Sequence, residues 1–298
     1  MIDDFRQIRH VTILGVGLIG GSLGLALKAK GFQGKITGLG RRMSTLNHAL
    51  RRKAIDVATT DFEEGLCEAE LAVICTPVDL IPAMAQSIAE SVPDTKPLVI
   101  TDVGSVKGQI VKSIEQFFAA KKHNHLRFVG SHPMAGSHRS GVDAARVDLF
   151  EGAKCIVTPV DETDLRALQL VADLWKFAGA ELHQLPPDEH DILIAGASHL
   201  PHLIASILTN TVGELRSNSA EALDFAATGF RDTTRIAAGS PEIWTGIFMQ
   251  NASALMQMVD ILSEKFTQFK TLLENRNANG ITQILVRAKN LRESLEER

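Results

Sequence analysis

Short apolar runs alternate with amphipathic stretches along the first part of the chain. Runs of this length, separated by helical patterns, are typical of βαβ units whose strands form a parallel sheet. We therefore expect six strands with helices between them. The runs are VTILG at 11–15, KITGL at 35–39, LAVIC at 71–75, PLVITD at 97–102, RFVGS at 127–131 and CIVTP at 155–159.

The pattern changes at PPDEH, which starts at residue 186. Beyond it the apolar positions recur at helical spacing and no strand signal follows, so we predict two domains, 1–186 and 187–298. The clearest helix begins at Ser240, an N-cap residue, and Pro241 suits its first turn. Its periodicity continues to Leu273, which predicts one long helix. Such a helix needs a partner to cover it, so we expect a homodimer through this domain; a self-contained helical bundle is the alternative.

The first predicted strand leads into GVGLIGGS, whose glycines are spaced Gly15-x-Gly17-x-x-Gly20. Between a strand and a helix, this spacing indicates a dinucleotide-binding turn in which the pyrophosphate approaches the backbone. Leu18 and Ile19 begin the helix that faces the phosphates, so they are candidate cofactor-binding residues too. The predicted fold class is α/β, with an N-terminal Rossmann-type dinucleotide-binding domain and an all-α second domain. A purely structural glycine-rich turn is the alternative.

The second strand ends at Gly40, where NAD-binding proteins of this fold usually carry an acid on the ribose hydroxyls. Here Arg41 and Arg42 follow instead, and their guanidinium groups, with the hydroxyl of Ser44, could bind a 2′-phosphate. We therefore predict NADP as the cofactor in preference to NAD. The alternative is that the two arginines form a solvated surface pair.

Two further strands are each followed by candidate site residues. Thr76 and Pro77 follow LAVIC, and Ser105 follows PLVITD. Ligands of open α/β sheets bind at the carboxyl ends of the strands, so we expect Thr76 and Pro77 beside the cofactor and Ser105 in the active site. For Ser105 the alternative is ordinary turn chemistry.

Histidines dominate two other segments. GSHPMAGSHRSG at 130–141 is rich in glycine and serine, so we predict a loop that carries His132 and His138. SHLPH places His199 and His202 in an otherwise apolar helix, where buried imidazoles need partners. A metal site built from these histidines is an alternative, but no recognised ligand spacing is present and we predict no metal.

An arginine completes the candidate chemistry. Arg235 lies in GFRDTTRIAAGSPEIW, just before a helix cap, where a guanidinium can bind a carboxylate through two hydrogen bonds. A histidine near a strand end and an arginine from a helical domain suit the oxidation of an alcohol on a carboxylate substrate. The histidine takes the hydroxyl proton while hydride leaves the same carbon.

Composition narrows the classes of protein. The 31 Lys and Arg residues are balanced by 35 Asp and Glu residues, and the chain has no basic block that could bind along a phosphate backbone. This argues against a protein that binds nucleic acid. No apolar run approaches a membrane span of about 18 residues and the N-terminus is charged, so we expect a cytoplasmic protein with no membrane partner. The three cysteines lack metal-ligand spacing.

Together these motifs resemble the prephenate/arogenate dehydrogenase family of tyrosine biosynthesis. They are GVGLIGGS, TDVGSVK, FVGSHPMAGSHRSGVDAA, SHLPH and GFRDTTRIAAGSPEIW, in this order. The resemblance implies oxidative decarboxylation of a cyclohexadienol, with hydride transfer to a nicotinamide cofactor and a dimer through the helical domain. It implies that His132 accepts the ring hydroxyl proton and that Ser105 orients it. It also implies substrate binding by His202, Arg235 and Trp244.

His138 occupies a position where relatives carry an acid or amide that helps to choose between arogenate and prephenate. Because neither is present, both substrates stay open, and the NADP signature at Gly40-Arg41 favours arogenate by resemblance. Two other readings are a two-domain β-hydroxyacid-type dehydrogenase and a non-catalytic NADP-binding sensor. The first relies on a catalytic lysine that the second domain lacks, and the second does not need His132, Ser105 and Arg235 together.

Overall fold

The computed structural model describes residues 5–136 and 139–296. The chain divides into two compact units, Met1–Asn251 and Ala252–Arg298. Within the first unit, the described strands form one eight-stranded sheet in the order β3-β2-β1-β4-β5-β6-β7-β8. All neighbours are parallel except β6 and β7, which are antiparallel. The strands are β1 (His10–Leu14), β2 (Lys35–Leu39), β3 (Val57–Thr59), β4 (Leu71–Ile74), β5 (Leu98–Asp102), β6 (Leu126–Pro133), β7 (Lys154–Thr158) and β8 (Glu181–Gln184).

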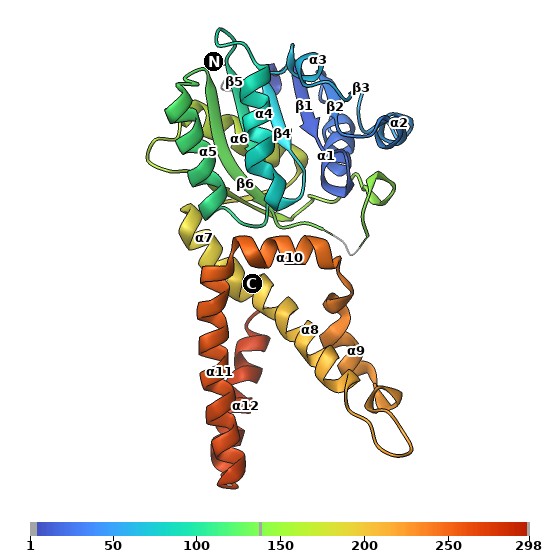
Figure 1. The fold of residues 1–298 in the computed structure, drawn as a ribbon, viewed down its shortest axis with the longest axis vertical. Helices are drawn as coiled ribbons and strands as arrows, with labels where there is room; N and C mark the ends of the chain where they lie inside the picture. The colour runs from blue at the N-terminus through green and yellow to red at the C-terminus, as the bar shows by residue number, and fades with distance from the viewer. Residues whose placement is uncertain (1–4, 137–138, 297–298) are drawn as a thin grey trace. The chain divides into compact units, whose positions relative to one another are not determined.

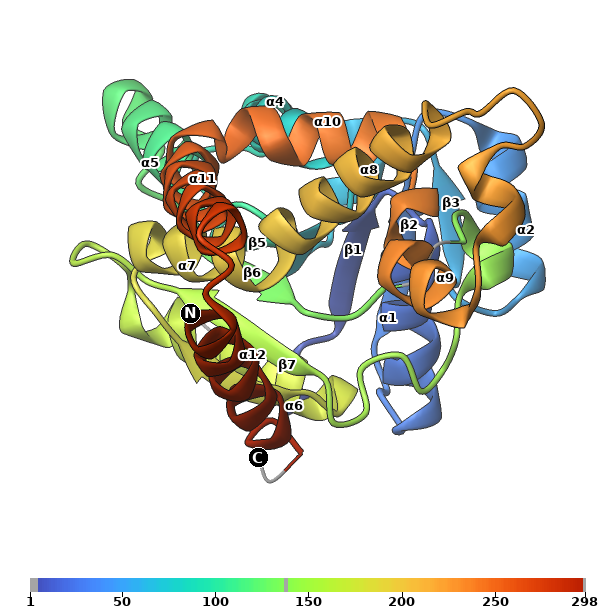
Figure 2. The same cartoon turned by 90° about the horizontal axis from the view of Figure 1, so that it is seen from below.

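Helices cover both faces of this sheet (Figures 1 and 2). Side chains of α1, α2 and α6 form one apolar cluster with the strands, and those of α3, α4 and α5 form another. The central strands β4 and β5 are buried throughout, which explains their continuous apolar runs. These helices are α1 (Leu18–Ala29), α2 (Met43–Arg51), α3 (Phe62–Leu66), α4 (Ile81–Ser91), α5 (Gly108–Lys121) and α6 (Leu165–Ala178).

The chain after β8 is helical, as predicted. Within the first unit it comprises α7 (Pro187–Ile194), the π-helical turn η4 (Ala195–His199), α8 (Leu200–Gly213), α9 (Thr228–Thr234), η6 (Arg235–Ala238) and α10 (Pro241–Gln250). The second unit consists of α11 (Ala252–Glu274) and α12 (Ala278–Glu293), which pack against each other. Short 3₁₀ turns complete the described chain: η1 (Phe5–Gln7), η2 (Val78–Leu80), η3 (Val142–Ala144) and η5 (Ala222–Phe225).

The six predicted strands are all present, but the sheet has two more. β3 has three residues and β8 is mostly exposed, so neither has the apolar run that marks the others. The loop predicted at 130–141 was wrong at its start, because β6 continues through His132 to Pro133 and pairs with β7. His132 is therefore held by a strand ladder opposite Ile156, in a buried position.

The helix predicted from Ser240 begins as expected but is not continuous. The Ser240 hydroxyl accepts a hydrogen bond from the Ile243 amide at 3.4 Å. The helix stops at Asn251, whose φ of −110° and ψ of 27° leave the helical region. Because only one residue interrupts the helices, the apolar periodicity carries on into α11 and conceals the break.

The expectation that no apolar run approaches a membrane span was also wrong. The helical segment Pro187–Gly213 is long and apolar enough to cross a membrane, with a mean hydropathy of 1.5 in its best window. This is a property of length and composition. The same segment carries His190, Asp191 and His199, whose side chains form hydrogen bonds inside the first unit.

Candidate active site

A cavity of about 400 Å³ opens at the carboxyl ends of β1, β2 and β4. Gly15 makes the turn after β1 with a φ of +90°, and a Cβ there would lie 2.8 Å from the carbonyl oxygen of Cys75. Both the backbone conformation and the close approach therefore require glycine. A Cβ on Gly17 would meet no atom within 4 Å, so this position stays open for a ligand.

Six of the predicted cofactor-binding residues line this cavity: Gly15, Gly17, Arg41, Arg42, Thr76 and Pro77. Leu18, Ile19, Gly20 and Ser44 are not among its lining residues. Gly20 has a packing role, since a Cβ there would lie 2.4 Å from the carbonyl oxygen of Gly15. Thr45, Phe62 and Gly141 also line the cavity and were not predicted.

The lining fits a dinucleotide. The hydroxyl of Thr76 is buried and has no hydrogen-bond partner in the described chain, so it offers an unused polar contact. The N-terminus of α1 begins next to Gly17 and has no side-chain cap, so its free amide groups can bind phosphate. Arg41 and Arg42 are exposed at the rim, and neither forms an ion pair with any described residue.

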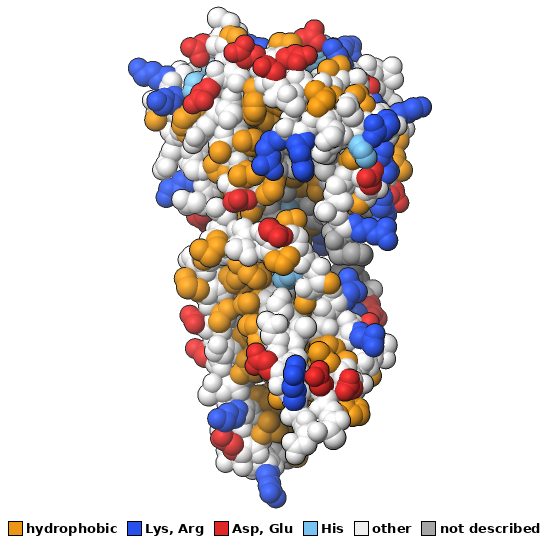
Figure 3. All heavy atoms as spheres, turned by 45° about the vertical axis from the view of Figure 1, so that its right-hand side comes forward, with side chains coloured by type: hydrophobic (Ala, Val, Ile, Leu, Met, Phe, Trp, Pro, Cys, Tyr) orange, Lys and Arg blue, Asp and Glu red, His pale blue; other side chains and the backbone are white. Residues whose placement is uncertain are grey.

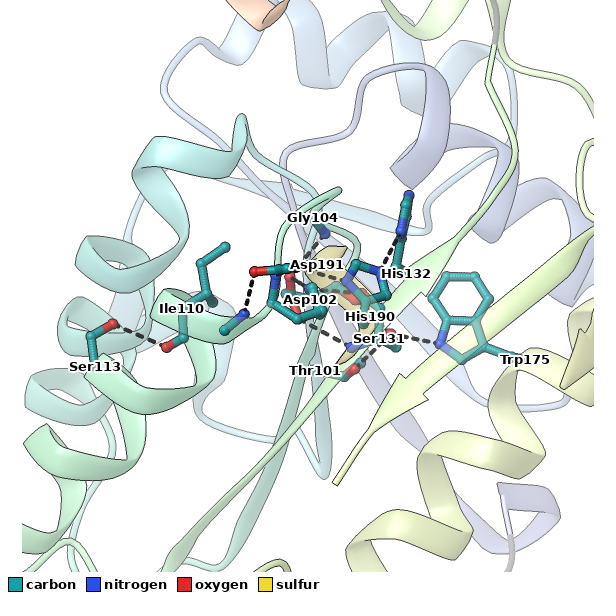
Figure 4. Close-up of polar contacts among 12 residues, drawn as sticks. Thr101, Asp102, Gly104, Ile110, Ser113, Ser131, His132, Trp175, His190 and Asp191 are labelled. Carbon is teal, nitrogen blue, oxygen red and sulfur yellow. Dashed lines mark hydrogen bonds and ion pairs between the residues drawn. The ribbon is translucent and has the colours of Figure 1, made fainter. Parts of the chain in front are cut away.

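A second polar group surrounds His132 at the end of β6 (Figure 4). Nδ1 of His132 lies 2.9 Å from Nε2 of His190, and Nδ1 of His190 lies 2.8 Å from Oδ1 of Asp191. A carboxylate accepts hydrogen bonds, so His190 donates through Nδ1, and its Nε2 in the neutral ring is left to accept from His132. His132 therefore carries its proton on Nδ1, and its Nε2 has a free lone pair.

Asp191 is fixed by the first turn of α5. Its Oδ1 accepts from the amide of Lys107 at 2.7 Å, and its Oδ2 accepts from the amide of Gly108 at 2.8 Å. An anionic side chain at a helix N-terminus is stabilised by the unpaired amides and the helix dipole. The charge that orients His190 is thus held by α5, an element of the sheet domain.

Lys107 makes the most buried ion pair of the site. Its side chain is fully buried, and Nζ donates to the carboxylate of Asp102 and to the carbonyl of Ser131 at 2.9 Å. Asp102 also accepts from the Ser131 amide at 3.2 Å. These bonds hold the backbone immediately before His132. Ser131 is fixed further, because its Oγ accepts a hydrogen bond from the Trp175 indole at 2.8 Å (Figure 4).

Burial lowers the pKa of His132 well below its usual value of 6.5, and the neighbouring His190, Lys107 and His199 lower it further. Each of these effects disfavours a positive charge on the ring. His132 is therefore a neutral imidazole near neutral pH, which is the protonation state of a general base.

Ser105 lies half-buried on the loop between β5 and α5. Within the described residues Ser105 forms no hydrogen bond with His132. The hydrogen-bond partner of His132 Nδ1 is His190. The resemblance assigned the orientation of His132 to Ser105, whereas the contact seen here comes from His190. His190, Asp191 and Lys107 were not predicted from the sequence.

A series of contacts links the polar group around His132 to His199, Trp244 and His202. Asn251 Nδ2 donates to the Asp191 carbonyl at 2.8 Å and lies 3.1 Å from His199 Nδ1. Burial is the main reason that the pKa of His199 falls to about 4. The ring of His199 contacts Trp244, which stacks on His202 with centroids 3.6 Å apart and an interplanar angle of 14°.

His202 is buried and its Nδ1 has no partner among the described residues, as is also true of Nε2 of His199. Buried imidazole nitrogens without partners are costly, so these two atoms are candidates for ligand contacts. Arg235 is exposed at the start of η6, which packs against α8, the helix that carries His202. A series of contacts through His190, Asp191, Asn251 and His199 thus connects His132 with Trp244 and His202. Arg235 lies on a segment packed against the helix that carries His202.

The chain is similar to known proteins over most of its length. The family profile for the nucleotide-binding domain of prephenate dehydrogenase matches residues 23–184, and the profile for its dimerization domain matches residues 186–287. A prephenate dehydrogenase of Bacillus subtilis (strain 168) is 35% identical over 291 residues, covering 97% of this chain and 77% of the relative. The chain belongs to the prephenate dehydrogenase family.

Other similar proteins are named after different substrates. A cyclohexadienyl dehydrogenase of Zymomonas mobilis is 30% identical, covering 92% of each chain. The structure of Aquifex aeolicus prephenate dehydrogenase in complex with hydroxyphenyl propionate and NAD⁺ has a TM-score of 0.89, with 29% identity over 97% of this chain and 99% of that one. Synechocystis arogenate dehydrogenase has a TM-score of 0.81, with 28% identity over 96% of this chain and 99% of that one.

Membership of the prephenate dehydrogenase family confirms the resemblance and the predicted fold class, and it removes the β-hydroxyacid-type alternative. One candidate of the sequence analysis, His138, lies outside the described residues. The residues that the sequence analysis missed had a weak signal. His190 is the last residue of PPDEH and Asp191 follows it, so both belong to a run of polar residues at 188–191 that is ordinary at the start of a helix.

Proposed function

We propose that this protein oxidises and decarboxylates arogenate to tyrosine, prephenate to 4-hydroxyphenylpyruvate, or both, with NADP as the hydride acceptor. The observation that carries the proposal is the relay Asp191–His190–His132, because it leaves the lone pair of His132 Nε2 available to accept a proton. The chain belongs to a family of dehydrogenases, in which such a base is needed. As the catalytic base, His132 takes the proton of the ring hydroxyl. The bound nicotinamide supplies the acceptor for the hydride of the same carbon.

Loss of CO₂ follows the oxidation. The bond between the carboxylate and the quaternary ring carbon breaks, and its electron pair enters the ring, which becomes aromatic. The low pKa of His132 suits it to accept one proton and to hold it only transiently. Lys107 and Asp102 keep the backbone before His132 in place, while Ser105, on the neighbouring loop, is proposed to contact the ring hydroxyl.

The helical segment is proposed to bind the rest of the substrate. Arg235 is exposed and unpaired in the described chain, so its guanidinium can bind a carboxylate through two hydrogen bonds. His202 offers a buried Nδ1, and the stacked Trp244 fixes the plane of its ring. His138 is proposed to help select between the keto and amino side chains, with arogenate preferred.

The cofactor choice rests on the rim of the cavity. Arg41 and Arg42 line it where a carboxylate would otherwise contact the ribose, and Ser44 is close by in sequence. Two positive charges favour a 2′-phosphate, so we propose NADP, although the Aquifex aeolicus relative was solved with NAD⁺.

The proposed organisation follows the family. Residues 1–186 form the NADP-binding domain, and residues 187–298 form a substrate and dimerisation domain that pairs two copies of the chain. The second family profile, a dimerization domain, supports this division. We propose a cytoplasmic enzyme without nucleic-acid or membrane partners.

Steady-state kinetics with both substrates and both cofactors test the proposal. We expect turnover with NADP and arogenate to have the highest kcat/KM, and comparable values for prephenate would define a dual-substrate enzyme. A protein that binds NADPH but turns over neither substrate would be the non-catalytic sensor instead.

A further inference from the structure

Two histidines and an aspartate meet at the amino-terminal edge of the sheet, opposite the cofactor cavity. Asp94 lies in the connection between α4 and β5, and His123 and His125 lie in the connection between α5 and β6. β5 and β6 are parallel neighbours, with Leu98 paired with Leu126, so the two connections lie side by side. The Leu98 amide donates to the His125 carbonyl at 3.1 Å and ties them together.

The three side chains converge on one point. Oδ1 of Asp94 lies 3.6 Å from Nδ1 of His125 and 3.9 Å from Nδ1 of His123. One ligand atom from each residue lies within 4.8 Å of the other two. Ligands about 2.1 Å from a tetrahedral Zn²⁺ are themselves about 3.4 Å apart. The two distances from Asp94 exceed this value by a few tenths of an ångström, and a separation of 4.8 Å, the upper limit for the three atoms, would have to close by about 1.4 Å.

The hydrogen bonding leaves this cluster incomplete. Nδ1 of His123 is buried and has no hydrogen-bond partner within the described chain, although it faces Asp94. The His125 side chain is only 7% exposed, and the nitrogen of this ring that faces Asp94 is Nδ1. A buried imidazole nitrogen without a partner is unfavourable, and a metal ion is one group that would satisfy it.

The charge balance of the cluster also suits a cation. Asp94 contributes a carboxylate, a group that binds cations. The nearby positive charge of Arg127 opposes a cation, but its Nε lies 3.4 Å from the carboxylate of Asp164, which offsets that charge. The Asp94 side chain is 88% exposed, so water can reach a remaining coordination position.

We propose that Asp94, His123 and His125 form a Zn²⁺ site that joins the α4–β5 connection to the α5–β6 connection. Imidazole nitrogen and carboxylate oxygen are ligands that zinc takes in proteins, and three protein ligands leave one position for water. The site fastens the start of two central strands. It is separate from the chemistry at the opposite edge of the sheet, so its role is structural.

Isothermal titration of the chelator-treated protein with ZnCl₂ tests the proposal. We expect one Zn²⁺ to bind per chain, and Asp94→Asn and His123→Asn each to weaken the affinity by about 10-fold or more. Zinc at about 100 times its Kd should lower the unfolding equilibrium constant of the wild type about 100-fold, and that of the two variants far less. Asp94→Asn is a safe variant for folding, because the side chain is exposed.

His48→Ala is the matched control. His48 Nδ1 lies 3.7 Å from Asp143 Oδ2, so it is a similar histidine–carboxylate pair, but no third ligand joins it among the described residues. Its zinc affinity should equal that of the wild type. A wild type that binds no zinc would overturn the proposal, as would Asp94→Asn and His123→Asn proteins that bind it as tightly as the wild type. An anomalous zinc peak among the three residues in a crystal would support it, and a peak elsewhere would contradict it.

Discussion

At the scale of single residues, the protonation of His132 is set by its neighbours. Asp191 fixes the tautomer of His190, and His190 fixes that of His132. The same logic operates wherever an acid orients a histidine base, because the wrong tautomer presents a proton where a lone pair is needed. His190 is therefore a positioning residue in this account, and His132 is the group that contacts the substrate.

Replacing His190 should affect the orientation of His132 and leave substrate binding unchanged. His190→Phe removes the acceptor for His132 Nδ1, so we expect kcat to fall about 100-fold or more with a KM near that of the wild type. His190→Gln supplies an amide oxygen in its place and should restore much of the loss. Both variants need thermal unfolding curves as a control, since His190 is fully buried. Equal kcat values for the wild type and both variants would rule out the relay.

The pH dependence follows from the direction of the His132 pKa. A base must be unprotonated, and a pKa below 6.5 keeps His132 neutral as the pH falls, so activity should persist to pH values below 6.5. His190 is one of the groups that lower this pKa. In His190→Gln the acidic limb of kcat/KM should therefore move to higher pH. A limb that stays in place would show that His190 has no electrostatic effect.

Arg41 decides the proposed cofactor preference. Arg41→Ala should lower kcat/KM for NADP about 10-fold or more, because a charge-assisted hydrogen bond contributes about 1.5–3 kcal/mol. The value for NAD, which lacks the 2′-phosphate, should change little and serves as the internal control. Equal losses with both cofactors would mean that Arg41 does not read the phosphate.

At the scale of elements, the site depends on how closely α7 approaches the start of α5. A Cβ on Gly108 would lie 2.7 Å from Asp188 Oδ1 and 3.0 Å from Asp191 Oδ2. The absence of a side chain at Gly108 therefore lets two carboxylates reach the helix N-terminus. One of these carboxylates is that of Asp191, which orients His190. The close packing of α7 against α5 is therefore needed for catalysis as well.

Gly108→Ala tests this packing. We expect it to destabilise the protein by about 1–3 kcal/mol in urea unfolding and to lower kcat, because α7 must move away from α5. Gly229→Ala is a matched control in helix α9, since a Cβ at Gly229 would meet no atom within 4 Å. A Gly108→Ala protein with the stability and activity of the wild type would show that the close approach is unimportant.

The elements also show what the sequence could predict. The interior strands were predictable because burial on both faces leaves apolar runs, and Gly15 and Gly17 were predictable because their turn is local. The relay was not, because His132 and His190 are 58 positions apart and meet only in the folded chain. The break at Asn251 was hidden for a related reason, since its side chain bonds to Asp191 and His199 on a different helix.

At the scale of the whole molecule, large apolar side chains remain exposed on the helices (Figure 3). Those on α11 and α12 include Ile261, Phe266, Leu285 and Leu291, each at least half exposed. Large apolar side chains exposed together on two helices indicate a surface that another protein covers. This agrees with the dimerization domain that matches residues 186–287.

Light scattering measures the expected dimer. The wild type should have twice the mass of the 32.3 kDa chain at micromolar concentration. Phe266→Glu together with Leu291→Glu should shift it toward the monomer, because charges are costly in an apolar interface. Leu165→Glu, at a side chain 79% exposed in the first unit, is the control and should stay dimeric. A monomeric wild type would contradict the proposed assembly.

The most direct measurement compares the wild type with His132→Asn by steady-state kinetics on arogenate and prephenate with NADP. We expect turnover by the wild type and a loss of kcat of about 10²- to 10⁴-fold in the variant, because a general base contributes that much. NADPH binding, followed by titration, should be unchanged. A His132→Asn protein with near-normal kcat would show that His132 is not the base.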